Sequence, residues 1–384
     1  MKVNKDIKLS ELKNLLPGFW DQSGKKILLI EKELDTTQGA PVFTVNGKYT
    51  SRGWTEWTQG FQYGSAIIQF DVTGDERFLD IGRTATVNKM APHVTHFGVH
   101  DHGFNNVSTY GNLLRLMHEG SIAHNKEEKD FYELALKLSG SVQAHRWTEL
   151  PDGGYIYSFN GPHSLFVDTI RSLRALVVSH ELGHDHRGEH DAVTSLLDRV
   201  VDHGEATAKY AVYYGEGRDS YDVWGRTAHE SVFNLNDGYY RCPNSQQGFS
   251  GFTTWTRGLA WAMVGFAEQL EYLETLPSDS LDHKKGLSYY KELFLKACRA
   301  TCDFYIREMP ADGIPYWDTG APELHLLGDY KNVAANPDND YEPVDSSAAA
   351  IGAQGLLRLG QYLGKEGNGA EYWAAGLQVA ERIF

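Results

Sequence analysis

The stretch Trp255-Thr256-Arg257-Gly258-Leu259-Ala260-Trp261 opens a segment whose apolar residues recur at helical spacing as far as Leu270. Its small residues favour a helix that packs closely against its neighbours. Three predicted helices, at 54–71, 253–271 and 346–361, are rich in Gly, Ala, Ser and Trp, whereas those at 75–91, 127–145 and 190–213 have polar faces. The sequence therefore predicts an inner set of close-packed helices surrounded by an outer, amphipathic set.

The remaining pattern is helical almost throughout, and strand signals are confined to short pieces such as Gly154–Phe159. Helices are predicted at 22–38, 54–71, 75–91, 103–118, 127–145, 164–181, 190–213, 253–271, 283–308, 346–361 and 369–384. Two concentric rings of antiparallel helices form an α/α barrel, so the predicted class is all-α. No linker rich in Pro, Gly or Ser interrupts the chain, which predicts a single domain over 1–384.

Composition excludes several classes of function. With 384 residues, 41% of them hydrophobic, the chain can bury a large core, and a net charge of -15 argues against nucleic acid as a partner. The three cysteines, Cys242, Cys298 and Cys302, form no disulfide framework and no CxxC motif. The amino-terminal residues lack an apolar signal region, and no apolar run is long enough for a membrane span. We therefore expect no membrane partner and a cytoplasmic location, or a periplasmic one if a signal was removed; the oligomeric state stays open.

Arg257 and Trp261 lie four residues apart, so they project from one helix face. An indole can stack on a pyranose ring, and a guanidinium can recognise a carboxylate or a hydroxyl pair with two aligned donors. This pair is typical of a site for an acidic sugar. A buried Trp beside an Arg that extends to the surface is the alternative interpretation.

Two aspartates are candidates for acid–base chemistry. Asp168 stands among apolar neighbours, where loss of solvation raises the pKa of a carboxyl group; a salt bridge to Arg171 or Arg174 is the alternative. Asp101 precedes a small-residue helix, and either caps it or lies at the mouth of a cavity. Asp345 precedes Ser346 and is better explained as a helix cap.

His180-Glu181-Leu182-Gly183-His184 is a literal HExxH, with His190 as a third possible ligand, and supports a zinc metallopeptidase as the rival function. Gly183 and the polar run after it, however, predict that the helix ends within the motif. The histidines at positions 93, 96, 100 and 102 also suggest a metal site, but no carboxylate or cysteine at a suitable spacing supports it. We expect no metal and no cofactor. A sugar epimerase or sugar-binding barrel is the third alternative.

These residues together resemble the unsaturated glucuronyl hydrolases, glycoside hydrolase family 88, over nearly the whole chain. The matching pieces keep the order and spacing of that family: His100-Asp101-x-Gly103-Phe104, Asp168-Thr169-Ile170 with Leu173, Gln247-Gly248-Phe249, Trp255-Thr256-Arg257-Gly258 with Ala260-Trp261, Asp312-Gly313 with Pro315-Tyr316-Trp317-Asp318, and Asp345-Ser346-Ser347-Ala348-Ala349-Ala350.

The resemblance implies an (α/α)6 barrel and a glycosidase that removes a terminal 4,5-unsaturated uronic acid from lyase-generated oligosaccharides by hydrating the C4=C5 vinyl ether. It makes Asp168 the general acid and base and Asp101 the second carboxylate. The substrate-binding candidates are His100, His229, Gln247, Arg257, Trp261 and Trp57.

Three features depart from the family pattern. The first inner helix has Gln62 where the family usually has Trp after Gly-Phe, so the cavity wall beside Trp57 differs. His102 replaces an apolar residue and adds a titratable group beside Asp101. Only five inner helices are visible, so we expect the sixth inner helix to be missing from this chain.

Overall fold

The structure, a computed structural model, describes residues 1–35, 37 and 39–384. The chain forms two compact units, each assembled from separate stretches of sequence. Unit 1 comprises Met1–Leu15, Thr148–Arg171 and Val201–Phe384, and unit 2 comprises Leu16–Trp147 and Ser172–Val200. The single domain expected over 1–384 stays a prediction.

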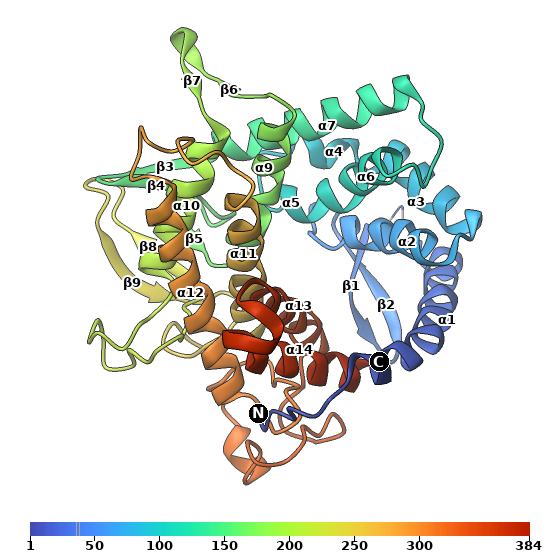
Figure 1. The fold of residues 1–384 in the computed structure, drawn as a ribbon, viewed down its shortest axis with the longest axis vertical. Coiled ribbons are helices and arrows are strands. Elements are labelled where there is room, and N and C mark those ends of the chain that lie inside the picture. Colours follow the sequence, from blue (N-terminus) through green and yellow to red (C-terminus); the bar gives the residue numbers. More distant parts are fainter. Residues whose placement is uncertain (36, 38) are drawn as a thin grey trace. The chain divides into compact units, whose positions relative to one another are not determined.

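Unit 2 is built mainly of helices (Figure 1). In chain order its elements are most of α1 (Leu9–Glu33), β1 (Ala40–Val45), β2 (Lys48–Arg52), α2 (Gln59–Thr73), α3 (Glu76–Lys89), α4 (Ala91–Val94), α5 (His102–Asn105), the π-helix η2 (Val107–Gly111), α6 (Asn112–His118), α7 (Lys126–His145), α9 (Arg174–Glu181), β6 (His186–Arg187), the 3-10 helix η3 (Glu189–Asp191), β7 (Val193–Thr194) and the start of α10 (Leu196–Tyr210).

The helices of unit 2 differ in burial as the sequence predicts. Residues 101–110, which form α5 and most of η2, are all buried, and α2 buries a face that includes Tyr63 and Phe70. The helices α3 and α7 instead keep polar residues exposed and pack through one face, α3 against α2 and α7 against α9. Side-chain caps start both outer helices, since Asp75 accepts the N–H of Arg77 and Asn125 accepts those of the first turn of α7.

Unit 1 combines several long helices with a small sheet. Its elements are the start of α1, β3 (Trp147–Leu150) and β4 (Gly153–Ile156), β5 (Ser164–Phe166), α8 (Thr169–Ser172), the end of α10, β8 (Glu230–Phe233), β9 (Tyr240–Asn244), α11 (Thr256–Leu273), α12 (Leu287–Glu308), the 3-10 helix η4 (Leu324–Leu327), α13 (Ser346–Tyr362), the π-helix η5 (Gly364–Asn368) and α14 (Ala370–Ile383).

In unit 1 the helix α11 is buried over most of its length, including every residue from Gly258 to Ala267. It packs between α12 and α13, and α13 packs in turn against α14 (Figure 1). The small residues of α11 and α13 permit this close contact, which confirms that 253–271 and 346–361 belong to the inner set. A three-stranded antiparallel sheet, in the order β5-β8-β9, lies beside these helices in the same unit.

Several elements differ from the sequence prediction. The first helix begins at Leu9, although Pro17 lies inside it, and it ends at Glu33; positions 36 and 38 of the predicted 22–38 helix lie outside the described residues. The segment predicted as a helix over 164–181 begins as strand β5, because its first residues pair with β8. The hairpin β1–β2 was not predicted at all.

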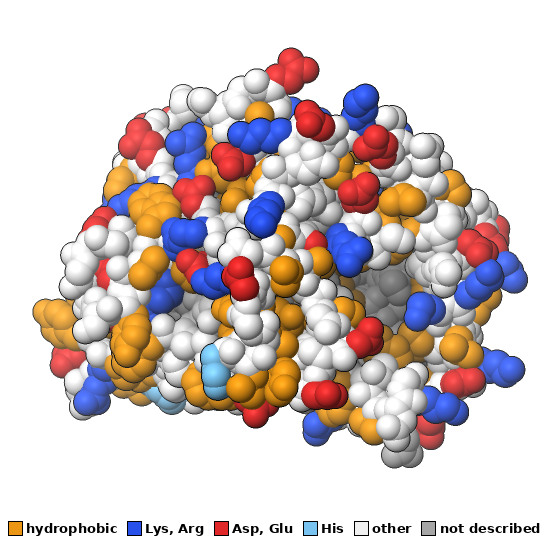
Figure 2. Space-filling model, turned by 90° about the horizontal axis from the view of Figure 1, so that it is seen from below, with side chains coloured by type: hydrophobic (Ala, Val, Ile, Leu, Met, Phe, Trp, Pro, Cys, Tyr) orange, Lys and Arg blue, Asp and Glu red, His pale blue; other side chains and the backbone are white. Residues whose placement is uncertain are grey.

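Acidic and basic side chains are interspersed over the face seen in Figure 2. Exposed ion pairs of the protein include Lys25 with Asp21 at 2.6 Å and Arg77 with Asp75 at 2.6 Å. Pairs of this kind contribute little to stability, because water screens them. Among the described residues, no helix is long and apolar enough to cross a bilayer.

Candidate active site

Asp168 lies just beyond β5, where the short helix α8 begins, and only 6% of its surface is exposed. The strand pairing continues to this point, because the N–H of Val167 donates to the carbonyl oxygen of His229 at 2.9 Å. The helix α11 covers the segment closely: a Cβ atom on Gly265 would lie 2.7 Å from Cγ2 of Ile170. Strand pairing and helix contact together fix the backbone that carries the buried carboxyl group.

Arg171, one of the two arginines considered as an ion-pair partner for this aspartate, binds Glu268, with 2.8 Å between Nη1 and Oε2. Both side chains are largely buried, so each compensates the charge of the other.

His229 is almost fully buried, and its imidazole lies between two aromatic rings, with centroid distances of 4.3 Å to Phe166 and 4.6 Å to Trp255. Its Nδ1 accepts the backbone N–H groups of Gln246, at 3.0 Å, and Gln247, at 3.2 Å. A ring nitrogen that accepts hydrogen bonds carries no proton, so the geometry assigns the neutral tautomer with its proton on Nε2. His229 is therefore held as a hydrogen-bond donor.

Gln247 contributes to this arrangement through its backbone, while its side chain is exposed. The loop that carries it is also held by Asp318, whose Oδ2 accepts the N–H of Phe249 at 2.9 Å and whose Oδ1 accepts that of Gly320 at 2.9 Å. Burial raises the pKa of Asp318, and the two N–H donors oppose the rise. Asp318 thus positions the loop that positions His229.

Arg257 lies in the first turn of α11, and a quarter of its side chain is exposed. Its Nη1 donates to Oγ of Ser347 at 3.2 Å and lies 3.7 Å from Oδ2 of Asp345. Asp345 also accepts the N–H of Ala348 at 2.8 Å, so the predicted cap of α13 is confirmed. The guanidinium group is therefore oriented by the start of a second helix, and its exposed part can meet an anion.

Trp261 follows Arg257 by one turn, but it is only 6% exposed. This burial supports the alternative that the indole packs in the core, and it restricts contact with a sugar to the exposed part of the ring.

Glu230, next to His229, is a buried carboxylate that the sequence analysis missed. It accepts hydrogen bonds from Asn160 Nδ2 at 3.0 Å, from Ser164 Oγ, and from Asn244 Nδ2 at 2.6 Å. These contacts tie together the three strands β5, β8 and β9. Its position after His229 was the only sequence signal for this role.

In unit 2, Asp101 directly precedes α5 and is 7% exposed. Its carboxylate makes no capping hydrogen bond to that helix, so the capping interpretation is wrong. The Nε2 atom of His100, itself buried, lies 3.7 Å from Oδ1 of Asp101. The two predicted site residues are thus adjacent in space as well as in sequence.

The backbone around Asp101 is fixed by polar contacts within unit 2. Ser172 Oγ donates to the carbonyl oxygen of His100 at 2.6 Å and accepts the N–H of Gly103 at 2.9 Å, while Gln143 Nε2 donates to the same carbonyl at 3.0 Å. A Cβ atom on Gly103 would lie 2.2 Å from the carbonyl oxygen of Ser172, so only glycine permits this approach.

His102 does not serve as an additional titrating group near neutral pH, contrary to expectation. It is buried, with Nδ1 2.9 Å from Ser139 Oγ and Nε2 3.0 Å from the carbonyl oxygen of His96. Burial lowers its pKa to about 4, and it lowers that of His93 to about 4 as well. Both imidazoles are therefore neutral structural groups in the physiological range.

Trp57 lies just before α2 and is half-buried. Its indole contacts Phe61 and Phe104 edge to face, with centroid distances of 5.6 and 6.1 Å. These contacts fix the ring orientation and leave part of its surface available to a ligand.

The HExxH segment lacks the geometry of a zinc peptidase. The helix α9 ends at Glu181, so His180 lies in its last turn and His184 lies beyond it. The two histidines therefore do not share a helix face, as the sequence predicted. Within the described part of the chain, His180, Glu181, His184 and His190 do not bring three ligand atoms together.

Comparison with known proteins gives one consistent family, although no family model matches the chain. The chain is 23% identical to an unsaturated glucuronyl hydrolase from Formosa agariphila over 312 residues, which cover 80% of this chain and 64% of that protein. It is 26% identical to one from a Bacillus species over 325 residues, covering 83% of this chain and 71% of the relative. The match to the Formosa protein thus spans less than two thirds of its length.

The fold is also similar to that of solved unsaturated glucuronyl hydrolases. The crystal structure of the unsaturated glucuronyl hydrolase from Streptococcus agalactiae superposes with a TM-score of 0.71 at 18% identity, covering 100% of this chain and 81% of that one. The predicted all-α class of the (α/α)6-barrel enzymes is confirmed by this likeness. In sequence and in fold, the chain is therefore similar to the unsaturated glucuronyl hydrolases, the enzymes of glycoside hydrolase family 88.

Proposed function

We propose that this protein removes a terminal 4,5-unsaturated uronic acid from oligosaccharides by hydrating the C4=C5 double bond. The observation that carries the proposal is the set of groups fixed in unit 1: the buried carboxyl group of Asp168, the Nε2–H donor of His229 and the oriented guanidinium of Arg257. An acid, a neutral donor and a cation are the groups that an anionic vinyl ether needs.

In the proposed reaction, the carboxylic acid of Asp168 gives its proton to C4, and the positive charge that develops at C5 is shared with the ring oxygen. Water then adds to C5 and gives a proton to the same carboxylate, which regenerates the acid and leaves a hemiketal. Cleavage of the bond between C5 and the ring oxygen forms a ketone at C5 and leaves a hemiacetal at C1. Collapse of this hemiacetal releases the rest of the oligosaccharide. Water never attacks C1, so the carboxylate separation of ordinary glycosidases is no guide.

The other candidates receive roles that match their chemistry. Arg257 binds the carboxylate of the unsaturated sugar, because a charge-assisted pair is the strongest contact available to it. His229 donates to a sugar oxygen, and Trp57 offers an aromatic face. We assign Asp101 as the second carboxylate, because the family resemblance places one there and its side chain does not cap α5.

The substrate class follows the relatives. Solved relatives hold the unsaturated sugars dGlcA-GalNAc6S and dGlcA-Glc-Rha-Glc, and a Streptococcus agalactiae relative is named an unsaturated chondroitin disaccharide hydrolase. We propose that this protein likewise acts on a lyase-generated, uronate-containing oligosaccharide. Cytoplasmic location remains a prediction, which cell fractionation with an antibody would test.

The decisive experiment measures loss of the ultraviolet absorbance of the conjugated double bond in an unsaturated glucuronyl disaccharide. We expect Asp168→Asn to lose at least the roughly 10²–10⁴-fold typical of general acid–base catalysis while it still binds the disaccharide. Asp279→Asn, the same change on an exposed loop of unit 1, is the matched control and should behave as the parent protein. A folded Asp168→Asn variant with parental turnover would remove this residue from the mechanism.

A further inference from the structure

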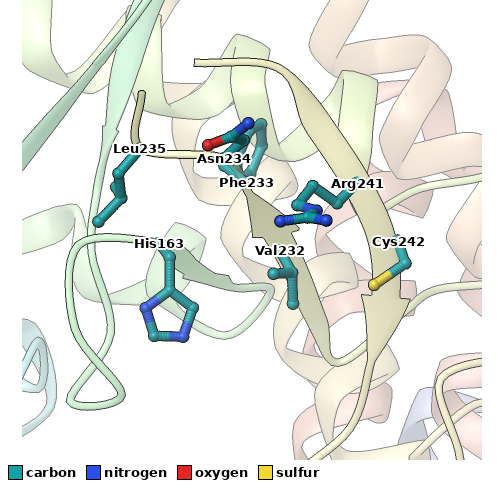
Figure 3. Close-up of a pocket in the computed structure, with 7 residues that line it drawn as sticks. All are labelled: His163, Val232, Phe233, Asn234, Leu235, Arg241 and Cys242. Atoms are coloured by element: carbon teal, nitrogen blue, oxygen red, sulfur yellow. The ribbon is translucent and has the colours of Figure 1, made fainter. Parts of the chain in front are cut away.

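A surface pocket of about 570 Å³ lies at the far end of the β5-β8-β9 sheet in unit 1, away from the end that carries Asp168. It is lined by His163, Val232, Phe233, Asn234, Leu235, Arg241 and Cys242 (Figure 3). We propose that this pocket binds a second anionic sugar of the same oligosaccharide, beyond the residue that reacts. The inference rests on the proposed function, whose substrate it extends.

The pocket is cationic within a strongly acidic protein. Arg241 is exposed and His163 is half-exposed, and in the described part of the chain neither side chain has an ion-pair or hydrogen-bond partner. None of the seven lining residues is acidic. Asp237, which contacts the lining residue Asn234 at 3.0 Å, also accepts the N–H of Tyr239. In a chain of net charge -15, an unneutralised arginine in a hollow points to an anionic ligand.

A β-bulge lies at the pocket and includes its lining residue Arg241. In the pairing of β8 with β9, Val232 lies opposite Cys242 and Phe233 lies opposite Tyr240, so Arg241 is the extra residue without a cross-strand partner. Bulges of this kind change the direction of a side chain. Arg241 and Cys242, although adjacent in a strand, consequently both line the pocket, as Figure 3 shows.

The two paired strands connect this pocket to the candidate active site. His163 immediately precedes β5 and Asp168 follows it, while His229 precedes β8 and Val232 lies near its end. At about 3.3 Å per strand residue, the five steps from His163 to Asp168 span roughly 16 Å. That separation exceeds one sugar ring, so the pocket would receive a sugar further along the chain.

An exposed aromatic ring packs against β5, the strand that connects the pocket with the segment of Asp168. The ring of Phe159 is 45% exposed and packs edge to face on Phe166 of β5, with 5.2 Å between the centroids. An exposed ring can stack on a sugar that crosses this region. In the pocket itself, Val232 and the exposed Leu235 offer apolar contact to the face of a ring, and Arg241 offers a fork of donors to a carboxylate or sulfate.

Cys242 makes the proposal measurable without turnover. It is the exposed cysteine of this chain, whereas Cys298 and Cys302 are buried, so alkylation of the native protein should report on the pocket. We expect a saturated hyaluronan hexasaccharide, which lacks the reactive double bond, to slow alkylation of Cys242. A neutral chitin hexasaccharide should not slow it, and Arg241→Gln should remove the protection. Arg187→Gln, an equal charge change on an exposed strand of unit 2, should leave it intact.

Kinetics give the second readout. For an unsaturated hexasaccharide, Arg241→Gln should raise KM about tenfold, the factor expected for the loss of one charge-assisted hydrogen bond, and leave kcat unchanged. For an unsaturated disaccharide, which is too short to reach the pocket, both constants should match the parent values. Equal alkylation with and without the hexasaccharide, together with an unchanged KM, would overturn the proposal. If the parent protein hydrolysed none of these substrates, the proposed function would be refuted. The alkylation assay would still test whether the pocket binds the hexasaccharide.

Discussion

Two substitutions at His229 should separate the two roles that the structure gives to its imidazole. In His229→Asn, the side-chain Oδ1 can replace Nδ1 as acceptor for the N–H groups of Gln246 and Gln247, but the Nε2 donor is lost. In His229→Gln, the longer side chain can present an N–H near the Nε2 position, but the acceptor is lost. Both variants lose the contacts with Phe166 and Trp255, so their difference isolates the hydrogen bonds.

The expected magnitudes follow from these bonds. Two hydrogen bonds at about 0.5–1.5 kcal/mol each would make His229→Gln less stable than His229→Asn by roughly 1–3 kcal/mol. A donor bond to the anionic sugar is stronger, so His229→Asn should lose about ten- to a hundredfold in kcat/KM relative to His229→Gln. Thermal melting and limited proteolysis of the 245–249 loop measure the first effect, and hydrolysis of an unsaturated disaccharide measures the second. If the asparagine variant were the less stable and the more active of the two, the assigned tautomer would be wrong.

Three further outcomes are expected. Arg257→Lys should lower kcat/KM about tenfold although charge is retained, because lysine cannot reproduce the fork of donors; steady-state kinetics that match the parent would contradict this. Trp261→Ala should destabilise the protein by roughly 3–5 kcal/mol, because the indole is buried; a melting temperature close to that of the parent would show that the ring is not part of the core. Burial lowers the pKa values of His93 and His102 to about 4, so between the unfolded value near 6.5 and pH 4 the unfolded chain binds more protons, and stability should fall as pH falls, by up to about 3 kcal/mol per histidine. Melting curves across this range should show that loss, and His102→Gln should reduce it; stability independent of pH would contradict the neutral assignment.

The inner helices and their caps could be predicted because their signals are local. A helix that packs on several neighbours needs small residues along its length, and this composition identified 253–271 and 346–361 as inner helices. The cap at Asp345 could be predicted for the same reason, since donor and acceptor lie three residues apart. The end of the HExxH helix was likewise visible in Gly183 and the polar residues that follow.

Elements that depend on distant partners could not be predicted. The strand β5 has three residues and pairs with a strand more than sixty positions later, so no periodic pattern reveals it.

Two other elements were missed although their signals are local. The hairpin β1–β2 carries the turn sequence Asn46-Gly47, whose positive φ angles of 51° and 74° suit a tight turn. The first helix was mispredicted because Pro17 usually ends a helix, whereas here the helix continues past it.

The same distinction applies to the candidate site. The family resemblance identified His229 as a candidate, but only its two backbone donors determine which ring nitrogen carries the proton. His102 was expected to influence Asp101, yet its nitrogens bind Ser139 and a backbone carbonyl. Such orientations depend on side chains and backbone brought together by folding.

Three acidic residues near the candidate site accept hydrogen bonds from different kinds of donor. Asp318 accepts two backbone N–H groups, Asp345 accepts one with a serine hydroxyl, and Glu230 accepts three side-chain donors. Because several donors hold the oxygens of each of these carboxylates in place, the three residues suit the positioning of neighbouring groups. These three residues fix, respectively, the loop beside His229, the start of α13 beside Arg257, and the sheet that leads to Asp168. Conversion of any of them to the amide should therefore displace the neighbouring groups and reduce activity. The free energy of unfolding should fall in the same variant. The same change at Asp168 should remove catalysis without that loss of stability, and this contrast separates the proposed acid from the carboxylates that hold the site in place.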